Sequence, residues 1–517
     1  MPAQQQLPPH LRRFRVEQDY AGYSGRDQAV WRHILGRLTT HLRDKAHPSY
    51  LAGLAQAGIG VERIPSLAEM DAQLARIGWR AVAVRGFIPP AVFTELQSLG
   101  VLAIAADIRS HEHIGYTPAP DIVHESAGHA PILSDPDYAR YLKACGVAGF
   151  KAIASREDNE VYAAIRHLSV VKEDPDATRD TVDQAEQRLR TACAARTYVS
   201  ESTKASRLYW WTAEYGLVGS LDHPLIYGAG LLSSIGEAEH CLTAQVAKLP
   251  LDLACVDQDY DITCMQPQLY VARDFNQLFE VLEAFAATLA WRRGGDYGLR
   301  EALRARTVNH VVLADGLELT GQVIRLERDP DGPIRLALLA GPGLLSRAGR
   351  VVEEQPWRGS ALVVLAGASL PQGPFRLELP GGLVLAGSGQ GRTVTGLRAS
   401  LQGRPLELPE SALVLFSESV PSVAGGPADP GAWDRWFGVE VAEADAEARA
   451  RRAKAEALAP ELDALYAEVR AMREHGVIQP GRLGAILEQL QAHPGDWLLS
   501  EEVQELLALQ ASPNGCH

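Results

Sequence analysis

The period of the hydrophobic pattern changes near residue 310. Before that point, apolar residues recur at three- and four-residue spacing, as in residues 29–42 and 275–291, which is typical of helices with one buried face. After it, short apolar runs alternate with turn residues such as Asp329-Pro330-Asp331-Gly332, which is typical of strands. The change predicts a large, mainly α-helical domain over residues 1–310 and a β-rich domain over residues 311–422.

A third region follows the strands. A stretch rich in glycine and proline, from Val423 to Gly431, leads into text rich in alanine, glutamate and arginine. This composition predicts a helical C-terminal region over residues 432–517, in the form of a hairpin or packing arm. The fold class is therefore multidomain, as expected for 517 residues.

Composition and charge exclude several classes of partner. The net charge of −14 opposes attraction to nucleic acid or to anionic lipid. The sequence contains no stretch of about 18 apolar residues, which a membrane span would need. Its first residues also lack the apolar run of a secretory signal. The six cysteines show neither a CxxC pair nor a disulfide framework. We expect a cytoplasmic protein without nucleic-acid or membrane partners.

The strongest local motif is His124-Glu125-Ser126-Ala127-Gly128-His129. Two imidazoles close in sequence are a common start of a transition-metal site. Zinc peptidases space these histidines four apart, but five residues correspond to about 140° around an α-helix. Both rings reach one metal only if His124 lies near a helix end or if the turn is distorted. Asp121, just upstream, is placed to cap such a helix or to contact a ligand.

A third ligand is needed, and a carboxylate would complete the facial arrangement of non-haem iron oxygenases. Glu214 is the candidate, because it stands among Tyr209, Trp210, Trp211 and Tyr215, where an unpaired carboxylate would be costly to bury. Residue type alone does not single it out among many acidic residues.

Each of these residues also has a purely structural interpretation. An isolated HExxxH string is more often structural or accidental than a metal site. An arginine such as Arg109 is usually a surface or ion-pair residue, and Trp210 and Trp211 could both be core. His111 and His113 are expected to be solvated or hydrogen-bonded loop residues rather than ligands.

Four sequence strings, found in this order, favour the functional interpretation over the structural one: YTPAPDIVHESAGHAPILSDPDYA, YWWTAEYGL, YGAGLLSSIGEAEHCL and QPQLYVARDF. From about Tyr20 to Leu289 the chain resembles the catalytic domain of the pterin-dependent aromatic amino acid hydroxylases. The resemblance implies that His124, His129 and Glu214 hold iron and are essential for catalysis. It implies substrate binding for five further residues: Arg109, Thr117, Pro120, Trp210 and Ser233. It implies a tetrahydropterin pocket made by five more: Gly86, Ile88, Phe93, Glu125 and Tyr209.

The implied reaction is hydroxylation of an aromatic ring by O2, with Fe(II) as cofactor and tetrahydropterin as cosubstrate. Overall likeness favours phenylalanine, with tyrosine as product, over tryptophan or tyrosine as substrate. A zinc hydrolase with Glu125 as base, and a sensor or scaffold that binds an aromatic ligand, are the alternatives.

Two segments depart from the family pattern. Residues 152–205 form a polar insertion that predicts one or two added helices, either as a lid or as an oligomer contact. Residues 311–517 match nothing in the resemblance. A homo-oligomer is possible, and the role of these segments stays open.

Overall fold

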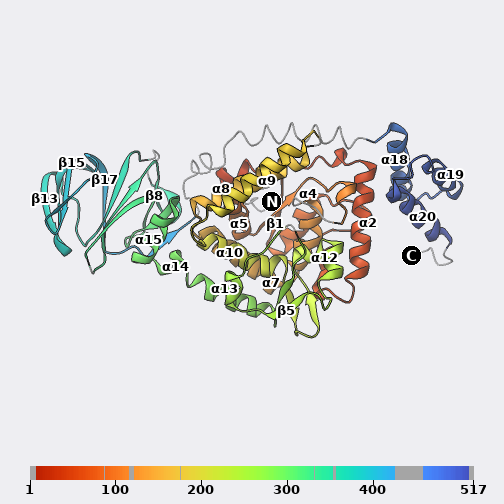
Figure 1. Ribbon diagram of the computed structural model, residues 1–517, viewed down its shortest axis with the longest axis horizontal. Helices are drawn as coiled ribbons and strands as arrows, with labels where there is room; N and C mark the ends of the chain where they lie inside the picture. Colours follow the sequence, from red (N-terminus) through yellow and green to blue (C-terminus); the bar gives the residue numbers. More distant parts are fainter. Residues whose placement is uncertain are drawn as a thin grey trace.

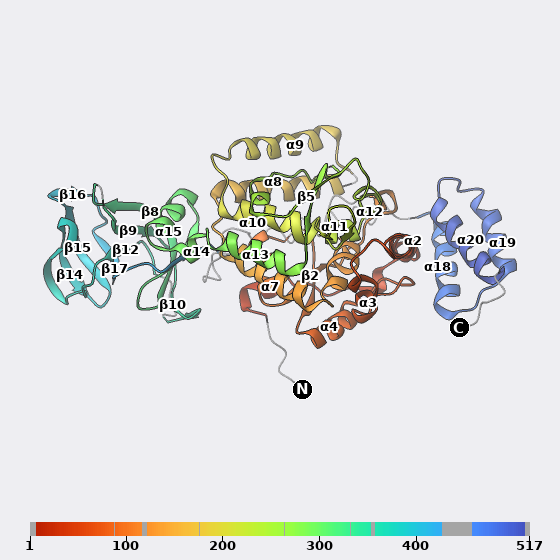
Figure 2. The ribbon, with the colours of Figure 1, turned by 90° about the horizontal axis from the view of Figure 1, so that it is seen from below.

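The computed structural model describes residues 7–86, 88–115, 121–174, 176–262, 264–330, 332–352, 357–425 and 458–511. They form three parts in a row, with the β-rich part at one end, a large helical part in the middle and a small helical part at the other end (Figure 1, Figure 2). Among the described residues, no helix is long and apolar enough to cross a lipid bilayer.

The central part begins with a strongly capped helix, α2 (Gly25–His41). Ser24 and Asp27 each accept a hydrogen bond from the other's backbone N–H, which fixes where the helix starts. Trp31 and Ile34 on its apolar face are fully buried. The other elements up to residue 113 are α1 (Pro9–Arg12), η1 (Tyr20–Gly22), α3 (Ser49–Gln56), α4 (Leu67–Leu74), η2 (Ala75–Ile77), β1 (Arg80–Val84), α5 (Pro90–Ser98), β2 (Val101–Ala105) and η3 (His111–His113). Strands β1 and β2 pair in parallel.

The middle of the central part carries the two motifs with candidate ligands. Its elements are η4 (His124–His129), α6 (Ala130–Ile132), α7 (Pro136–Lys151), α8 (Arg156–Glu173), α9 (Arg179–Ala194), α10 (Glu201–Tyr209) and η5 (Trp210–Glu214). Helices α8 and α9 fall in the polar insertion and pack against each other, with α9 on the outer side of α8 (Figure 2).

The central part ends in a small sheet and a helix. The strands lie in the order β4-β3-β6-β5, and most of the residues of β3 and β6 are buried. The elements are β3 (Leu217–Gly219), β4 (Pro224–Ile226), α11 (Ala229–Leu232), α12 (Ile235–His240), β5 (Ala247–Pro250), η6 (Leu253–Asp257), β6 (Gln268–Ala272) and α13 (Phe275–Ala286). The amphipathic helix α13 buries Leu278, Leu282 and Phe285 against the core.

The β-rich part is a sheet of twelve strands with two hydrophobic cores. One core lies against α14 (Ala290–Arg293) and α15 (Gly295–Ala305), and the second lies among the later strands. The strands are β7 (Val308–Val312), β8 (Leu317–Arg328), β9 (Ile334–Ala340), β10 (Leu345–Arg347), β11 (Arg350–Val351), β12 (Ser360–Leu365), β13 (Gly373–Leu379), β14 (Leu383–Gln390), β15 (Thr393–Leu401), β16 (Arg404–Leu406), β17 (Ser411–Ser417) and β18 (Ser422–Ala424), with the 3₁₀ turn η7 (Pro380–Gly382) before β14. Only β12 and β17 pair in parallel within the described part of this sheet.

The C-terminal part consists of α18 (Pro460–His475), α19 (Pro480–Leu490) and α20 (Trp497–Ala511). Its buried side chains belong to the same hydrophobic core as those of α2. About the first third of the predicted helical region, residues 432–457, lies outside the described residues.

Candidate active site

The two histidines of the HExxxH motif lie in a π-helical segment rather than an α-helix. The N–H of Ala130 bonds to the carbonyl of Glu125, five residues earlier, which is the i→i+5 bond of a π-turn. This wider turn brings residues five apart onto one side. The rings of His124 and His129 lie 5.4 Å apart, nearly perpendicular to each other. The distortion that the five-residue spacing requires is therefore present.

Glu214 ends a second π-helical segment, η5. The N–H of Tyr215 bonds to the carbonyl of Trp210, again five residues earlier, at 2.9 Å. Two glycines let the segments approach. A Cβ on Gly128 would lie 2.6 Å from the carbonyl oxygen of Ala229, and one on Gly228 would lie 2.4 Å from that of Glu214. Neither position has room for any side chain, so the backbone itself sets the distance between η4, η5 and α11.

The three candidate ligands meet. Glu214 Oε1 lies 3.0 Å from His129 Nε2, and Glu214 Oε2 lies 3.3 Å from His124 Nε2. One donor atom from each residue falls within 4.8 Å of the others. Two neutral imidazoles and one carboxylate are the donor set of a non-haem Fe(II) site with open positions. The residues present therefore fit an iron ion.

The electrostatics of the three residues agree with a cation between them. Burial lowers the pKa of His124, but the nearby carboxylate of Glu214 outweighs burial and raises that pKa to about 9. Burial raises the pKa of Glu214, yet His129 and His124 together hold it well below the ordinary value. Glu214 is thus a carboxylate that needs positive charge beside it.

Ser233 fixes the tautomer of His124. The hydroxyl of Ser233 donates to the carbonyl of Ala229 at 2.7 Å, so its oxygen is left to accept from His124 Nδ1–H at 3.1 Å. With its proton on Nδ1, a neutral His124 keeps the lone pair of Nε2 for a metal ion beside Glu214. Such a partner orients a metal-ligating imidazole and increases its basicity.

Arg109 lies on the loop that precedes η3 and forms a forked ion pair with Asp121. Its Nε and Nη2 donate to the two carboxylate oxygens at 2.8 Å each, with both side chains almost completely buried. Burial raises the pKa of Asp121, but Arg109 outweighs burial and lowers it. Asp121 also accepts the backbone N–H of His124 at 3.0 Å, so it joins the arginine to the first histidine. Arg109 Nη1 points to the carbonyl of Ser233, at 3.5 Å.

Trp210 is half-buried between two tyrosines, whereas Trp211 is core. The indole of Trp210 stacks on Tyr215 at 4.5 Å and on Tyr260 at 4.3 Å between ring centroids. Its Nε1 donates to Gln266 Oε1 at 3.4 Å. Tyr260 and Gln266 were not expected from the sequence, although Gln266 opens the QPQLYVARDF string and Tyr260 is an aromatic residue in a polar loop. An edge of Trp210, rather than an open face, is left for a substrate ring.

Two of the residues expected to hold a pterin, Phe93 and Tyr209, contact each other next to His129. Phe93 on α5 and Tyr209 on α10 meet edge to face at 5.8 Å, and Tyr209 lies 6.1 Å from His129. Gln97, which the sequence did not single out, donates to the Tyr209 hydroxyl at 2.6 Å.

The other three residues expected in the pterin pocket are Glu125, Gly86 and Ile88. Glu125 is buried, its pKa is raised by burial, and its Oε1 lies 4.0 Å from His124 Nε2. Gly86 has φ = 58°, a conformation that favours glycine, and Ile88 packs in the same small core as Phe93. The last two substrate candidates, Thr117 and Pro120, lie outside the described residues.

Comparison with known proteins decides the family. The sequence model of one protein family, the biopterin-dependent aromatic amino acid hydroxylases, matches residues 14–171 and 188–298, just over half of the chain. The chain belongs to this family. The unmatched residues between the two segments run from the end of α8 into α9, within the predicted insertion.

Relatives of this hydroxylase are named phenylalanine-4-hydroxylase. The enzyme of Mesorhizobium japonicum is 30% identical over 286 residues, which cover 54% of this chain and 87% of that protein. The enzyme of Chromobacterium violaceum is 29% identical and covers 52% of this chain and 76% of that protein. A crystal structure of the Chromobacterium violaceum enzyme, described as containing iron(III) and 7,8-dihydrobiopterin, matches at 27% identity with a TM-score of 0.42, over 53% of this chain and 85% of the other. The family expected from the four strings is thus confirmed.

Proposed function

We propose that this hydroxylase converts L-phenylalanine to L-tyrosine with Fe(II), tetrahydropterin and O2. The observation that supports the proposal most is the meeting of His124, His129 and Glu214 within 4.8 Å, beside a buried arginine. Family membership and the phenylalanine-4-hydroxylases among the relatives favour phenylalanine. When bound, iron and the reduced pterin supply the activation of O2 and two electrons.

The protein's own residues would provide position and charge. Glu214 and the Nε2 atoms of His124 and His129 would hold the iron. Ser233 keeps the proton of His124 on Nδ1. Asp121 fixes the guanidinium of Arg109, and the charge of Arg109 would bind a substrate carboxylate. The ring of the substrate would then lie toward Trp210 and the iron.

The pterin would bind between Phe93 and the iron ligands. Phe93 offers a ring face for stacking, and Gly86 lets the backbone approach the edge of the pterin. Glu125 is buried close to His124, and burial raises its pKa.

The thiols support a proposal for the compartment. All five described cysteines are unpaired, and three of them are buried. Free thiols fit a reducing compartment, so we place the reaction in the cytoplasm. Its partners would be small molecules, namely the amino acid, O2 and tetrahydropterin.

Product analysis tests the function. The full-length protein is loaded with Fe(II) without air and then given O2, tetrahydropterin and phenylalanine, tryptophan or tyrosine in separate reactions. We expect tyrosine from phenylalanine, only with pterin, and none from Glu214→Ala. Hydrolysis by a zinc-loaded form would favour the hydrolase alternative, and no product from an iron-loaded protein would favour the sensor.

A further inference from the structure

Two of the three C-terminal helices, α18 and α20, pack directly on α2 of the hydroxylase domain. Tyr466 and Val469 of α18 and Val503 of α20 are completely buried, in one core with Trp31 of α2. A Cβ on Gly25 would lie 2.8 Å from the backbone carbon of Tyr466. Helices α2 and α18 therefore touch backbone to backbone, and their relative position has little freedom.

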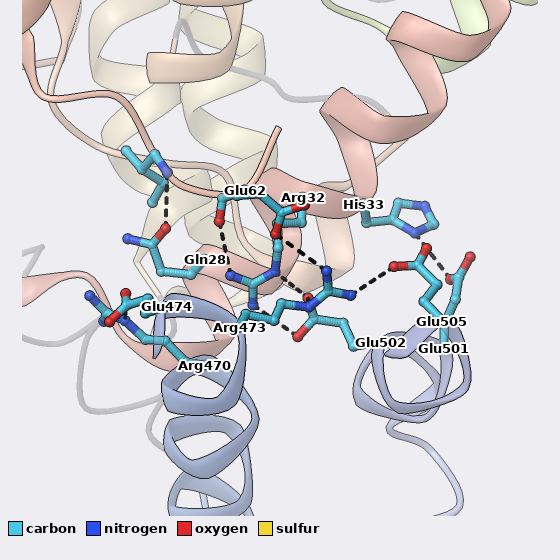
Figure 3. A network of polar contacts seen from close by, with 11 residues as sticks. Gln28, Arg32, His33, Glu62, Arg470, Arg473, Glu474, Glu501, Glu502 and Glu505 are labelled. Carbon is cyan, nitrogen blue, oxygen red and sulfur yellow. Dashed lines mark hydrogen bonds and ion pairs between the residues drawn. The ribbon is translucent and has the colours of Figure 1, made fainter. Parts of the chain in front are cut away.

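Buried charges hold α20 in the same place (Figure 3). Arg32 of α2 pairs with Glu502 of α20, and both side chains are 4% exposed. Arg473 of α18 lies 3.5 Å from the same carboxylate and 2.8 Å from Glu505. Burying such charges is unfavourable unless each keeps its partner, so separation of the helices would leave Arg32 uncompensated.

From this position the C-terminal helices reach both ends of the loop that carries Arg109. Arg470 donates to the carbonyl of Tyr23 at 2.8 Å, and the hydroxyl of Tyr23 donates to the carbonyl of Ala106 at 2.5 Å. Beyond Arg109, the indole of Trp497 lies 5.2 Å from the ring of His111 and 5.1 Å from that of His33.

Packing, more than hydrogen bonding, locates the ring of His111. Its Nε2 is buried without a hydrogen-bond partner among the described residues. Burial also lowers the pKa of His111, which favours the neutral ring against the indole. Trp497 starts α20, and Asp496 just before it accepts bonds from Leu499 N–H and from the hydroxyl of Tyr466. The position of Trp497 is thus fixed from within the C-terminal part.

We infer that Trp497 is a positioning residue for the amino acid substrate, which acts through His111 on the loop Asp107–His113 and so on Arg109. This inference rests on the proposed function, because Arg109 matters here as the group that binds the substrate carboxylate. The C-terminal helices then complete the substrate site without touching the iron. Removing the indole loosens the loop and weakens amino acid binding, while the pterin side, around Phe93 and Tyr209, is unaffected.

The test uses the full-length, iron-loaded protein with Trp497→Ala. We expect the KM for phenylalanine to rise by about 3- to 10-fold, the range that loss of one aromatic contact provides. The kcat and the KM for tetrahydropterin should stay at the wild-type level. Amide hydrogen exchange in a peptide covering residues 106–114 should become faster. Trp497→Phe should bring the KM for phenylalanine and the exchange rate of residues 106–114 most of the way back to wild-type values. Leu509→Ala, at an exposed position of the same helix, should change neither the KM for phenylalanine nor the exchange rate.

A double-mutant cycle with His111→Ala gives a second measurement. If the contact carries the effect, the double variant should resemble either single one, because each removes the same interaction. Unchanged exchange at residues 106–114, an unchanged KM for phenylalanine, or additive effects in the cycle would each overturn the inference. Hydrogen exchange does not depend on turnover, so it decides about the loop even if the wild-type protein fails to hydroxylate phenylalanine.

Discussion

His129 Nε2 lies 3.0 Å from Glu214 Oε1, although the two residues are 85 positions apart in the chain. Their backbones reach this distance because η4 and η5 are both π-helical and because Gly128 and Gly228 remove side chains that would separate them. The pair is buried, so each residue depends on the other and on a cation for a favourable state.

Glu214→Gln should therefore lose iron. Mutation of a group that only hydrogen-bonds to a metal ligand already lowers metal affinity by about 10- to 100-fold. Loss of a charged ligand itself should therefore reduce Fe(II) affinity by about 100-fold or more. The measurement is metal content after anaerobic loading and gel filtration. Glu283→Gln, an exposed carboxylate on α13, is the matched control and should bind iron normally. Full occupancy in Glu214→Gln would contradict the assignment of this ligand.

Ser233→Ala should weaken the site without removing a ligand. The substitution takes away the acceptor of His124 Nδ1–H, so the ring loses its fixed tautomer and orientation. We expect Fe(II) affinity to fall by about 10- to 100-fold. Competition with a chelator of known affinity measures it. Ser134→Ala, at a serine hydroxyl that bonds only to backbone carbonyls, should have no such effect.

Arg109→Lys should separate substrate binding from metal binding. A lysine keeps the charge but cannot form the fork with Asp121 or offer further donors in the same plane. The KM for phenylalanine should rise by about 10- to 100-fold, as expected for losing one hydrogen bond to a charged group. Iron content should stay at the wild-type level. An unchanged KM would show that another cation binds the carboxylate.

Gly25→Ala should loosen the C-terminal helices. The new methyl group would overlap the backbone of Tyr466, and overpacking of this kind costs about 1–3 kcal/mol. Thermal unfolding and limited proteolysis between the parts would report it. The control is Gly484→Ala in α19, where nothing lies within 4 Å and the helix should become slightly more stable. Equal stability of both variants would contradict the tight packing of α2 on α18.

Stability should depend on pH through Glu237 of α12. Burial raises its pKa to about 7, above the value of about 4.5 for an unfolded chain. The folded state therefore binds more protons between these values, and the wild type loses stability as pH rises from 4.5 to 7. Glu237→Gln avoids the buried charge. Its free energy of unfolding should exceed that of the wild type by on the order of 1–3 kcal/mol at pH 8, with little difference at pH 4.5. Urea unfolding at several pH values measures this, and a constant difference would contradict it.

The sequence predicts the chemistry of the site better than its geometry. The five-residue spacing of His124 and His129 requires a distorted turn, and that turn is present. Glu214 was identified by family resemblance, because many carboxylates fit by residue type. Tyr260 and Gln266 were missed since their roles arise from a loop folding back onto Trp210, which leaves no periodic signal.

Outside the site, the sequence predicts elements but not their partners. The apolar runs after residue 310 predict β structure, but the signal is weak at β15, because its buried positions are interrupted by Arg398 and a glycine. The pattern of α18 predicts a buried face. The pattern does not indicate that this face packs on α2. The hydrophobic effect is non-directional, so any other apolar face could bury the helix equally well.

The ion pair between Arg32 and Glu502 joins residues separated by 470 positions. During synthesis on the ribosome, the second partner emerges 470 residues after the first, when the twelve strands of the β-rich part have already been made. Helix α2 must wait in a partly exposed state, with its arginine hydrated and its apolar face available to chaperones. The order of translation thus makes the docking of α20 a late step in the burial of α2, and a chain that stops before Glu502 leaves Arg32 without this partner.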